Sequence, residues 1–201
     1  MGIIVVLIGL ILAGLVLIWF IRLLSDLFDK SRLLFFIVVA CIILIPYGLL
    51  NNYEKTYYLD YIPQEMGVSK ILYQETDSWG FGPGGNETGV VVFELPENSA
   101  KTIENAGIDF FNVISREDTQ RNKYIRECGE WQESPLGDTN SSWTLNSFLD
   151  RYGFGIAVDE GIEKEINLVA SKKGSYFTGC SGGAVIIVAP KIKKVFFVYA
   201  G

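Results

Sequence analysis

Two long stretches of the chain contain no charged residue. Residues 3–21 (IIVVLIGLILAGLVLIWFI) and 33–50 (LLFFIVVACIILIPYGLL) consist mainly of Ile, Leu, Val and Phe. A helix rises about 1.5 Å per residue and the hydrocarbon core of a bilayer is about 30 Å thick, so each stretch is long enough to cross it. The alternatives are buried core helices or a cleaved signal peptide, but only two residues precede the first stretch and no small-residue cleavage site follows it. We therefore expect two transmembrane helices, with spans 3–21 and 33–50, joined by loop 22–32.

The segment between the two stretches carries most of the positive charge of this part of the chain. Arg22, Lys30 and Arg32 lie there, whereas Lys55 is the only basic residue between the second stretch and Lys70. Basic residues favour the cytoplasmic side of a membrane. We therefore expect loop 22–32 to be cytoplasmic and both chain termini to lie outside the cytoplasm, and we interpret the membrane as a bacterial inner membrane.

Residues 51–68 are polar and rich in tyrosine, and we expect them to form a juxtamembrane stalk. Five tyrosines follow or end the second span: Tyr47, Tyr53, Tyr57, Tyr58 and Tyr61. Amphipathic tyrosine rings favour the headgroup region of a bilayer, which fits an interfacial position. For Tyr57 to Tyr61 the alternative is that the rings pack on the domain that follows.

Residues 69–201 are numerous enough for one domain of ordinary size. Residues 51–201 hold 14 Lys+Arg and 21 Asp+Glu, a formal charge of −7. Negative charge repels a phosphate backbone, so we do not expect nucleic acid as a partner. We expect the acidic domain to be held at the membrane by the two spans rather than by its own surface.

The pattern of residues in this domain predicts an α+β fold with a mostly antiparallel sheet and two or three helices. We expect strands at 69–79, 89–95, 175–179, 184–189 and 194–199. We expect helices at 97–106, 143–152 and 160–173, with Gly107 ending the first and Asp159 capping the last. The apolar run 108–114 fits either a strand or a helix, and a further helix is expected near 117–127.

The domain contains two cysteines, Cys128 and Cys180, while Cys41 lies within the second apolar stretch. In an oxidising compartment two such cysteines are expected to form a disulfide. The alternative is a pair of unpaired, buried thiols. The outward topology favours the disulfide.

The segment GCSGG, residues 179–183, fits the G-x-S-x-G pattern around many nucleophilic serines. It is similar to the G-D-S-G-G of trypsin-like proteases only in its glycines, because Cys180 replaces the aspartate. The chain has no histidine to act as a base, and a β-rich run follows Ser181 where the pattern requires a helix. We therefore interpret the segment as a turn between strands, with its glycines at positive φ.

A hydrolase remains the alternative to a non-enzymatic role. A lysine can activate a serine when burial lowers the lysine pKa, and two carboxylates can hydrolyse a glycosidic bond. Lys172 and Lys173 are the lysines nearest to Ser181 in sequence, but they read as the solvated end of a helix. No spacing selects a particular carboxylate pair.

The sequence contains no recognisable metal or cofactor motif. Neither C-x-x-C nor H-E-x-x-H is present, and no calcium-binding loop appears. The glycine-rich segment 80–85 lacks the G-K-[ST] ending of a phosphate-binding loop. We expect neither a metal nor a cofactor.

Two groups of residues in turn-like segments are candidates for a binding surface. The first group flanks or lies in the loop 80–88 and comprises Trp79, Phe81, Pro83 and Asn86; the second comprises Trp131 and Trp143. Aromatic side chains on exposed loops are typical of interaction hot spots. The alternative is that each tryptophan covers an edge of the core.

The membrane anchor, the acidic domain and the missing catalytic base together favour a binding role over catalysis. We expect a membrane-anchored extracytoplasmic protein that binds a protein partner. Two concrete versions are an accessory subunit of an envelope complex and an immunity-type protein that neutralises a toxin.

Overall fold

The computed structural model of the chain describes residues 2–79, 86–114, 128–137, 143–153 and 155–201. Within these ranges, the side chains of residues 2–13, 17, 49–55, 79 and 86 lie outside the description. The chain divides into two compact units, Met1–Glu54 and Lys55–Gly201. Each unit is described by itself below.

The first unit consists of helix α1 (Gly2–Lys30) and most of helix α2 (Arg32–Leu59). The segment 22–32, expected as a loop, is helical except at Ser31. Residues 22–30 contain no Gly or Pro, so nothing in them stops a helix. Ser31 is a residue type that favours helix starts, and its Oγ accepts a hydrogen bond from the backbone N of Leu34 at 3.4 Å.

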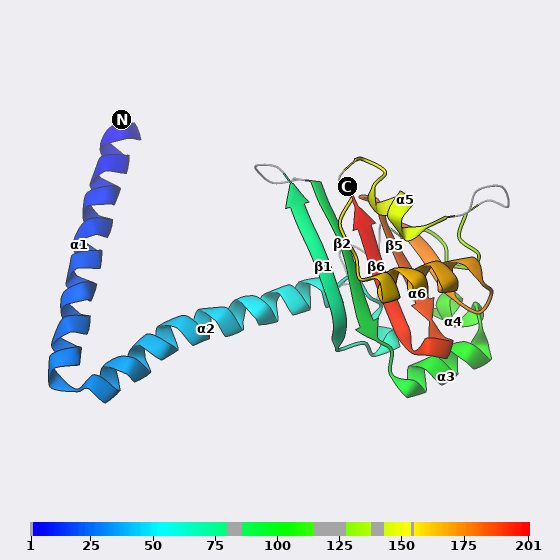
Figure 1. Ribbon diagram of the computed structural model, residues 1–201, viewed down its shortest axis with the longest axis horizontal. Helices are drawn as coiled ribbons and strands as arrows, with labels where there is room; N and C mark the ends of the chain where they lie inside the picture. Colours follow the sequence, from blue (N-terminus) through cyan, green and yellow to red (C-terminus); the bar gives the residue numbers. More distant parts are fainter. Residues whose placement is uncertain (1, 80–85, 115–127, 138–142, 154) are drawn as a thin grey trace. The chain divides into compact units, whose positions relative to one another are not determined.

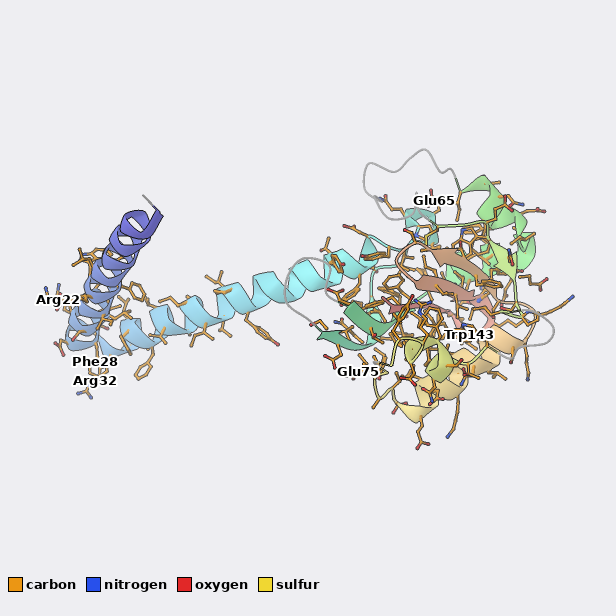
Figure 2. All side chains as sticks on the ribbon, turned by 90° about the horizontal axis from the view of Figure 1, so that it is seen from above. Arg22, Phe28, Arg32, Glu65, Glu75 and Trp143 are labelled. Atoms are coloured by element: carbon orange, nitrogen blue, oxygen red, sulfur yellow. A yellow bond between two sulfur atoms is a disulfide. The ribbon has the colours of Figure 1, made fainter. Side chains whose placement is uncertain are left out.

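Aromatic and basic side chains pack around this helix junction. The rings of Phe28 and Phe35 lie edge to face, with centroids 5.1 Å apart. The guanidinium of Arg32 lies 5.7 Å from the centroid of the Phe28 ring (Figure 2). Among the residues that the structure describes, no helix combines the length and the apolar character that crossing a membrane requires.

The second unit contains a six-stranded sheet, as expected for an α+β domain, and every strand pair in it is antiparallel (Figure 1). The strand order is β1-β2-β6-β5-β4-β3. The strands are β1 (Ile71–Trp79), β2 (Asn86–Glu94), β3 (Gln132–Glu133), β4 (Tyr176–Cys180), β5 (Ala184–Ala189) and β6 (Lys194–Ala200). The predicted strands in all five segments are confirmed, and β3 is an addition too short to carry a sequence signal.

Helices cover both faces of the sheet. One face packs against the 3₁₀ helix η1 (Gln64–Met66), α3 (Glu97–Ala106) and α4 (Asp109–Val113). The other face packs against α5 (Leu145–Leu149) and α6 (Glu160–Ser171). Successive residues of β2 alternate between the two clusters, with Val91 in the first and Val92 in the second. Burial on both faces explains why β2, β5 and β6 read as almost continuous apolar runs.

The helix predictions agree with the structure to different degrees. The helix at 97–106 is confirmed, and Gly107 ends it at φ 61°. The ambiguous run 108–114 is helical at α4. Helix α6 begins after the predicted cap: the Asp159 carboxylate accepts hydrogen bonds from the backbone N of Gly161 and Ile162 at 2.8 and 3.1 Å. The helix expected near 117–127 lies outside the described residues.

The helix expected at 143–152 is shorter than its apolar pattern suggested. Helix α5 starts after Thr144, whose Oγ1 accepts a hydrogen bond from Ser147 N at 3.3 Å, and it ends before Asp150. The backbone N of Gly153 then donates to the Asp150 carbonyl at 2.8 Å, with Gly153 at φ 79°. A glycine in this left-handed conformation closes the helix early.

Residues expected to form a stalk contribute to the domain instead. Helix α2 continues to Leu59, and Ile62 and Met66 are fully buried in the cluster beneath α3 and α4. Tyr58 and Tyr61 pack against the same cluster. For Tyr58 and Tyr61 the structure therefore favours packing on the domain over a position in the lipid headgroup region.

Candidate functional site

The tyrosines that precede η1 form one wall of a pocket in the second unit. The pocket has a volume of about 250 Å³. The lining residues come from the end of α2, the start of β2, the turn after β4 and the end of β6, segments far apart in the sequence. They are Tyr57, Tyr58, Tyr61, Glu87, Ser181, Gly182, Ala184, Phe197, Tyr199 and Gly201. We call this site the tyrosine pocket.

Ring contacts and hydroxyl pairs hold the aromatic wall of the tyrosine pocket together. The hydroxyls of Tyr57 and Tyr61 are 2.9 Å apart, and those of Tyr58 and Tyr199 are 3.3 Å apart. The Tyr61 ring stacks on Phe197 with centroids 4.5 Å apart, and the Tyr58 ring stacks on Tyr199 at 6.4 Å. Tyr57 and Tyr61 are four residues apart, the spacing that brings side chains together at the end of a helix.

Tyr199 is the most buried tyrosine of the pocket, with 9% of its surface exposed. Burial raises the pKa of the Tyr199 phenol, and its hydrogen bond with Tyr58 and the nearby charge of Glu87 raise that pKa further. The phenol therefore stays protonated and neutral. Gly89 lies opposite Tyr199 in the β2–β6 pairing, and a Cβ there would overlap the Tyr199 ring and hydroxyl.

Glu87 provides the charge of the pocket. Its backbone is fixed near the start of β2, because its N donates to the Gly201 carbonyl at 2.6 Å and its carbonyl accepts from Gly201 N at 3.0 Å. Among the lining residues that the structure describes, Glu87 is the one acidic residue, and none is basic. The described lining therefore combines aromatic rings, hydroxyls and one acidic side chain.

Ser181 lies in the turn between β4 and β5, and it lines the tyrosine pocket. Gly182 and Gly183 adopt φ 70° and 74°, which confirms the predicted turn with glycines at positive φ. The guanidinium of Arg151 donates hydrogen bonds to the carbonyls of Gly183 and Ala200, which fixes the turn against β6.

The structure separates Ser181 from Lys172 and Lys173, the two lysines nearest to it in sequence. Lys172 and Lys173 precede β4 and Ser181 follows it, so the five residues of that strand separate them by about 16 Å. That distance is beyond the hydrogen-bond reach that a nucleophile and its base need. The strand β5, rather than a helix, follows Ser181.

The disulfide between Cys128 and Cys180 is present, as predicted, and joins residues 52 positions apart. Around it, Gly129 N donates to the Gly179 carbonyl at 2.8 Å, and the Thr178 Oγ1 donates to the Gly129 carbonyl at 2.9 Å. These bonds attach the segment at 128 to 129 to the edge of β4. The turn that carries Ser181 therefore starts from a covalently fixed residue.

The residues predicted around the glycine-rich loop are only partly described. Trp79 ends β1 and Asn86 begins β2, and the two are paired in the β1–β2 ladder. Phe81 and Pro83 lie outside the described residues. Asn86 is next in sequence to Glu87, and a binding role of these four residues stays a prediction.

The two other predicted residues lie in different clusters. The Trp131 ring stacks on Phe111 with centroids 4.3 Å apart, in the cluster beneath α3 and α4. The Trp143 ring lies 5.7 Å from Phe148, in the cluster beneath α5 and α6 (Figure 2 labels Trp143). The structure therefore does not bring the two tryptophans into one surface.

Sequence reasoning missed two central residues of the pocket, Glu87 and Tyr199. The tyrosine-rich segment was a usable signal, but its composition fitted a membrane interface equally well. Tyr199 lies inside a β-rich run, where an aromatic residue is predicted to belong to the hydrophobic core. Nothing in the sequence pairs these positions with residues 57–61.

A second hollow of about 360 Å³ lies beside α4. Its lining is mainly apolar, with Phe110, Val113 and Ile114, and includes the carboxylates of Glu65 and Asp109. Among the described residues, its lining holds no serine, cysteine or lysine. No cluster of metal-ligating side chains is found in the part of the chain that the structure describes.

The comparisons with known proteins do not add to this geometry. No protein-family model, no curated protein and no solved structure matches the chain.

Proposed function

We propose that this chain is a membrane-anchored binding protein and that the tyrosine pocket is its binding site. The observation that carries the proposal is the pocket, a concave site with an aromatic lining and a few polar groups, which is the usual form of a small-ligand site. A binding role accounts for its composition better than catalysis, because the described lining holds one acidic side chain and no lysine, arginine or histidine.

Anchoring through residues 3–21 and 33–50 is part of the proposal and rests on the sequence, because no membrane-spanning helix is found among the described residues. Support comes from the described side chains of α1 and α2. Leu15, Val16 and Leu33 are 58%, 64% and 74% exposed, and a helix that is apolar on its exposed sides needs an apolar environment.

An extracytoplasmic position of the second unit is also proposed. The basic residues between the two helices favour a cytoplasmic junction, and the disulfide fits an oxidising compartment. A protein partner at the domain surface, in an envelope complex or as a neutralised toxin, remains the wider form of this proposal. The toxin version predicts that cells lacking the protein become sensitive to a toxin-producing neighbour.

Extraction of membranes at alkaline pH tests the anchor. A protein held by two spans stays in the pellet with other integral proteins, whereas a peripheral protein is released. External protease applied to spheroplasts tests the topology, because an extracytoplasmic domain is digested and a cytoplasmic one is shielded. Release at alkaline pH, or protection of the domain, would contradict the corresponding part of the proposal.

A photo-reactive amino acid at position 181 tests the pocket as a binding site in intact cells. Ser181 is exposed on the pocket wall, so the substitution leaves the core unchanged. We expect an adduct at position 181, seen as a protein band or as a ligand mass, and none at the exposed Lys164 on α6. Identical adducts at both positions, or none, would count against the tyrosine pocket.

A serine hydrolase is the second candidate, and the observation in its favour is that Ser181 lines the same pocket as a carboxylate residue, Glu87. A fluorophosphonate probe distinguishes it from a binding protein. Labelling that disappears in Ser181→Ala would establish a nucleophile, and the binding proposal predicts no labelling above that variant.

A further inference from the structure

We infer that the tyrosine pocket binds an organic ammonium group, such as a quaternary ammonium or a protonated alkylamine. This inference rests on the proposed function, because it takes that pocket as the binding site and names the chemistry of its ligand.

The aromatic lining is the first argument. Five of the residues that line the cavity are aromatic: Tyr57, Tyr58, Tyr61, Phe197 and Tyr199. The face of an aromatic ring carries negative potential and attracts cations, and a cage of such rings is a common way to hold a quaternary ammonium. Neighbouring ring centroids lie about 4.5 to 6.4 Å apart, so the rings of the wall support one another.

Charge is the second argument. Glu87 is the one acidic side chain among the described lining residues, and none of these residues has a basic side chain. The pocket also belongs to the part of the chain with a formal charge of −7. The Glu87 carboxylate repels a ligand anion, whereas a cation is attracted to Glu87 and to the rings.

Hydroxyl groups allow the pocket to accept hydrogen bonds from a primary amine as well. The Tyr58 and Tyr199 hydroxyls are a pair in which one oxygen donates and the other keeps acceptor capacity. Burial keeps the Tyr199 phenol neutral, so the wall does not add a second negative charge. Among the described side chains of the wall, Glu87 is therefore the one that carries a negative charge.

The size of the pocket limits the ligand to a small group. A volume of about 250 Å³ equals roughly eight times the ~30 Å³ that one water occupies in the liquid. Most sites for drug-sized ligands are larger, at about 300–1,000 Å³. An ammonium headgroup fits this space, and a folded polypeptide segment does not.

Two sources could present such a group, a lipid headgroup and a soluble organic cation. Tyr57 follows the end of the second apolar stretch by seven residues, which reach at most about 25 Å when fully extended. If that stretch spans the bilayer, the pocket lies close to the headgroups. The chemistry of recognition is the same for both sources, and the experiment separates them.

The first experiment titrates the full chain, purified in an uncharged detergent, with tetramethylammonium chloride. Sodium chloride at equal ionic strength provides the reference, and heat of binding is the readout. We expect saturable binding of tetramethylammonium and none of sodium. Ethanolamine, titrated in the same way, tests the primary amine.

Matched variants assign the binding to the pocket. Glu87→Gln keeps the shape of an exposed side chain and removes its charge, so affinity should fall by about fivefold. Tyr57→Leu removes a half-buried ring and should weaken binding to a similar degree. Glu75→Gln, on β1 (Figure 2), removes an exposed carboxylate that does not line the pocket and should leave the affinity unchanged. Unchanged thermal unfolding of Glu87→Gln shows that the loss is not a loss of fold.

Nanodiscs separate the two sources. In discs of phosphatidylglycerol the pocket should bind tetramethylammonium as it does in detergent. If discs that also contain phosphatidylethanolamine weaken that binding, the headgroup competes for the pocket and the lipid is the source; equal affinity in both discs assigns a soluble cation.

The inference is overturned if tetramethylammonium and ethanolamine show no saturable binding, or if Glu87→Gln binds them as tightly as the wild type. Its failure is distinguishable from failure of the proposed function. Adducts specific to position 181 without cation binding would contradict the ammonium ligand and would still support the tyrosine pocket as a binding site. Cation binding by a chain that alkaline pH releases from membranes would contradict only the proposed membrane anchor.

Discussion

Gly89 and Tyr199 lie opposite each other on β2 and β6, and the smallest residue faces one of the largest. A missing side chain on one strand thus creates the space for a buried phenol on the next. The tyrosine pocket depends on this pair, because Tyr199 both lines it and pairs with Tyr58. The packing of Tyr199 against Gly89 across two strands therefore shapes the tyrosine pocket.

Replacing Gly89 by alanine should destabilise the domain by about 1–3 kcal/mol, because the new methyl group overlaps the Tyr199 ring. Urea unfolding of the purified chain measures this change. Gly179→Ala is the control: it lies on β4 with no atom near its would-be Cβ, so the change should stay within about 0.5 kcal/mol. Equal effects of the two substitutions would contradict the packing argument.

The stability of the domain should decrease at alkaline pH in a way that depends on Tyr199. An unfolded tyrosine loses its proton near pH 10, and the raised pKa of Tyr199 keeps its proton in the folded state to higher pH. The contribution is therefore complete below about pH 10 and is lost as the pH rises above it. In Tyr199→Phe, the free energy of unfolding measured in urea should fall less steeply between about pH 9 and pH 11 than in the wild type. Tyr152→Phe, which removes an exposed hydroxyl, is the control. Equal slopes for Tyr199→Phe and the wild type would show that this group does not cause the loss.

At the scale of elements, the β4–β5 turn is held from two sides. The disulfide ties Cys180 to Cys128, and Arg151 bonds the carbonyls of Gly183 and Ala200. Strand β3 adds only two residue pairs to the edge of β4. The covalent link therefore supports the edge of the sheet where backbone pairing is weakest.

Removal of the disulfide should lower the free energy of unfolding by about 2–4 kcal/mol, since it closes a long loop in the unfolded chain. Urea unfolding of Cys128→Ser/Cys180→Ser against the wild type measures the loss. Cys41→Ser is the matched control, because Cys41 is a free, exposed cysteine, and it should unfold like the wild type. A double variant as stable as the wild type would show that the link is not structural.

The start of α6 depends on one side chain. The Asp159 carboxylate accepts two backbone hydrogen bonds, so Asp159→Ala should destabilise the domain by about 1 kcal/mol. Asp159→Asn retains an oxygen acceptor and should cost less. Glu160→Ala, in the same helical turn, serves as control for loss of charge. Thermal unfolding compares the three variants, and an Ala variant as stable as the Asn variant would argue against the cap.

At the scale of the whole molecule, the boundary between the two units decides what must be kept for the domain to fold. Contacts place it after Glu54, and residues beyond it reach the core. Met66 and Ile62 are 0% and 2% exposed, as deeply buried as residues of the central strands. The segment expected as a stalk is thus part of the folded domain.

A chain that begins at Lys55 should fold, whereas one that begins at Ser69 should be less stable by about 3–6 kcal/mol, because it lacks two side chains worth about 1.5–3 kcal/mol each when buried. Circular dichroism during thermal unfolding compares them. Equal stability of the two chains would place Ile62 and Met66 outside the cooperative core.

Local patterns in the sequence determined the elements of this protein. The β-rich runs predicted the strands, Gly107 and Asp159 predicted where helices end and begin, and GCSGG predicted a turn. These signals are local because a strand, a cap or a turn is stabilised by residues a few positions apart. The disulfide was predictable as well, because the domain offers a single pair of cysteines.

Only the tertiary structure decided the site. It packed Tyr58 and Tyr61 on the core instead of leaving them in a stalk, and it placed Trp131 and Trp143 in separate clusters. It also brought Glu87 and Tyr199 to Ser181, with more than a hundred residues between the first tyrosines and the last. Such a pocket depends on the strand order and on the space left by Gly89. Both arise from contacts between segments that are far apart in the chain, so a short stretch of sequence does not predict them.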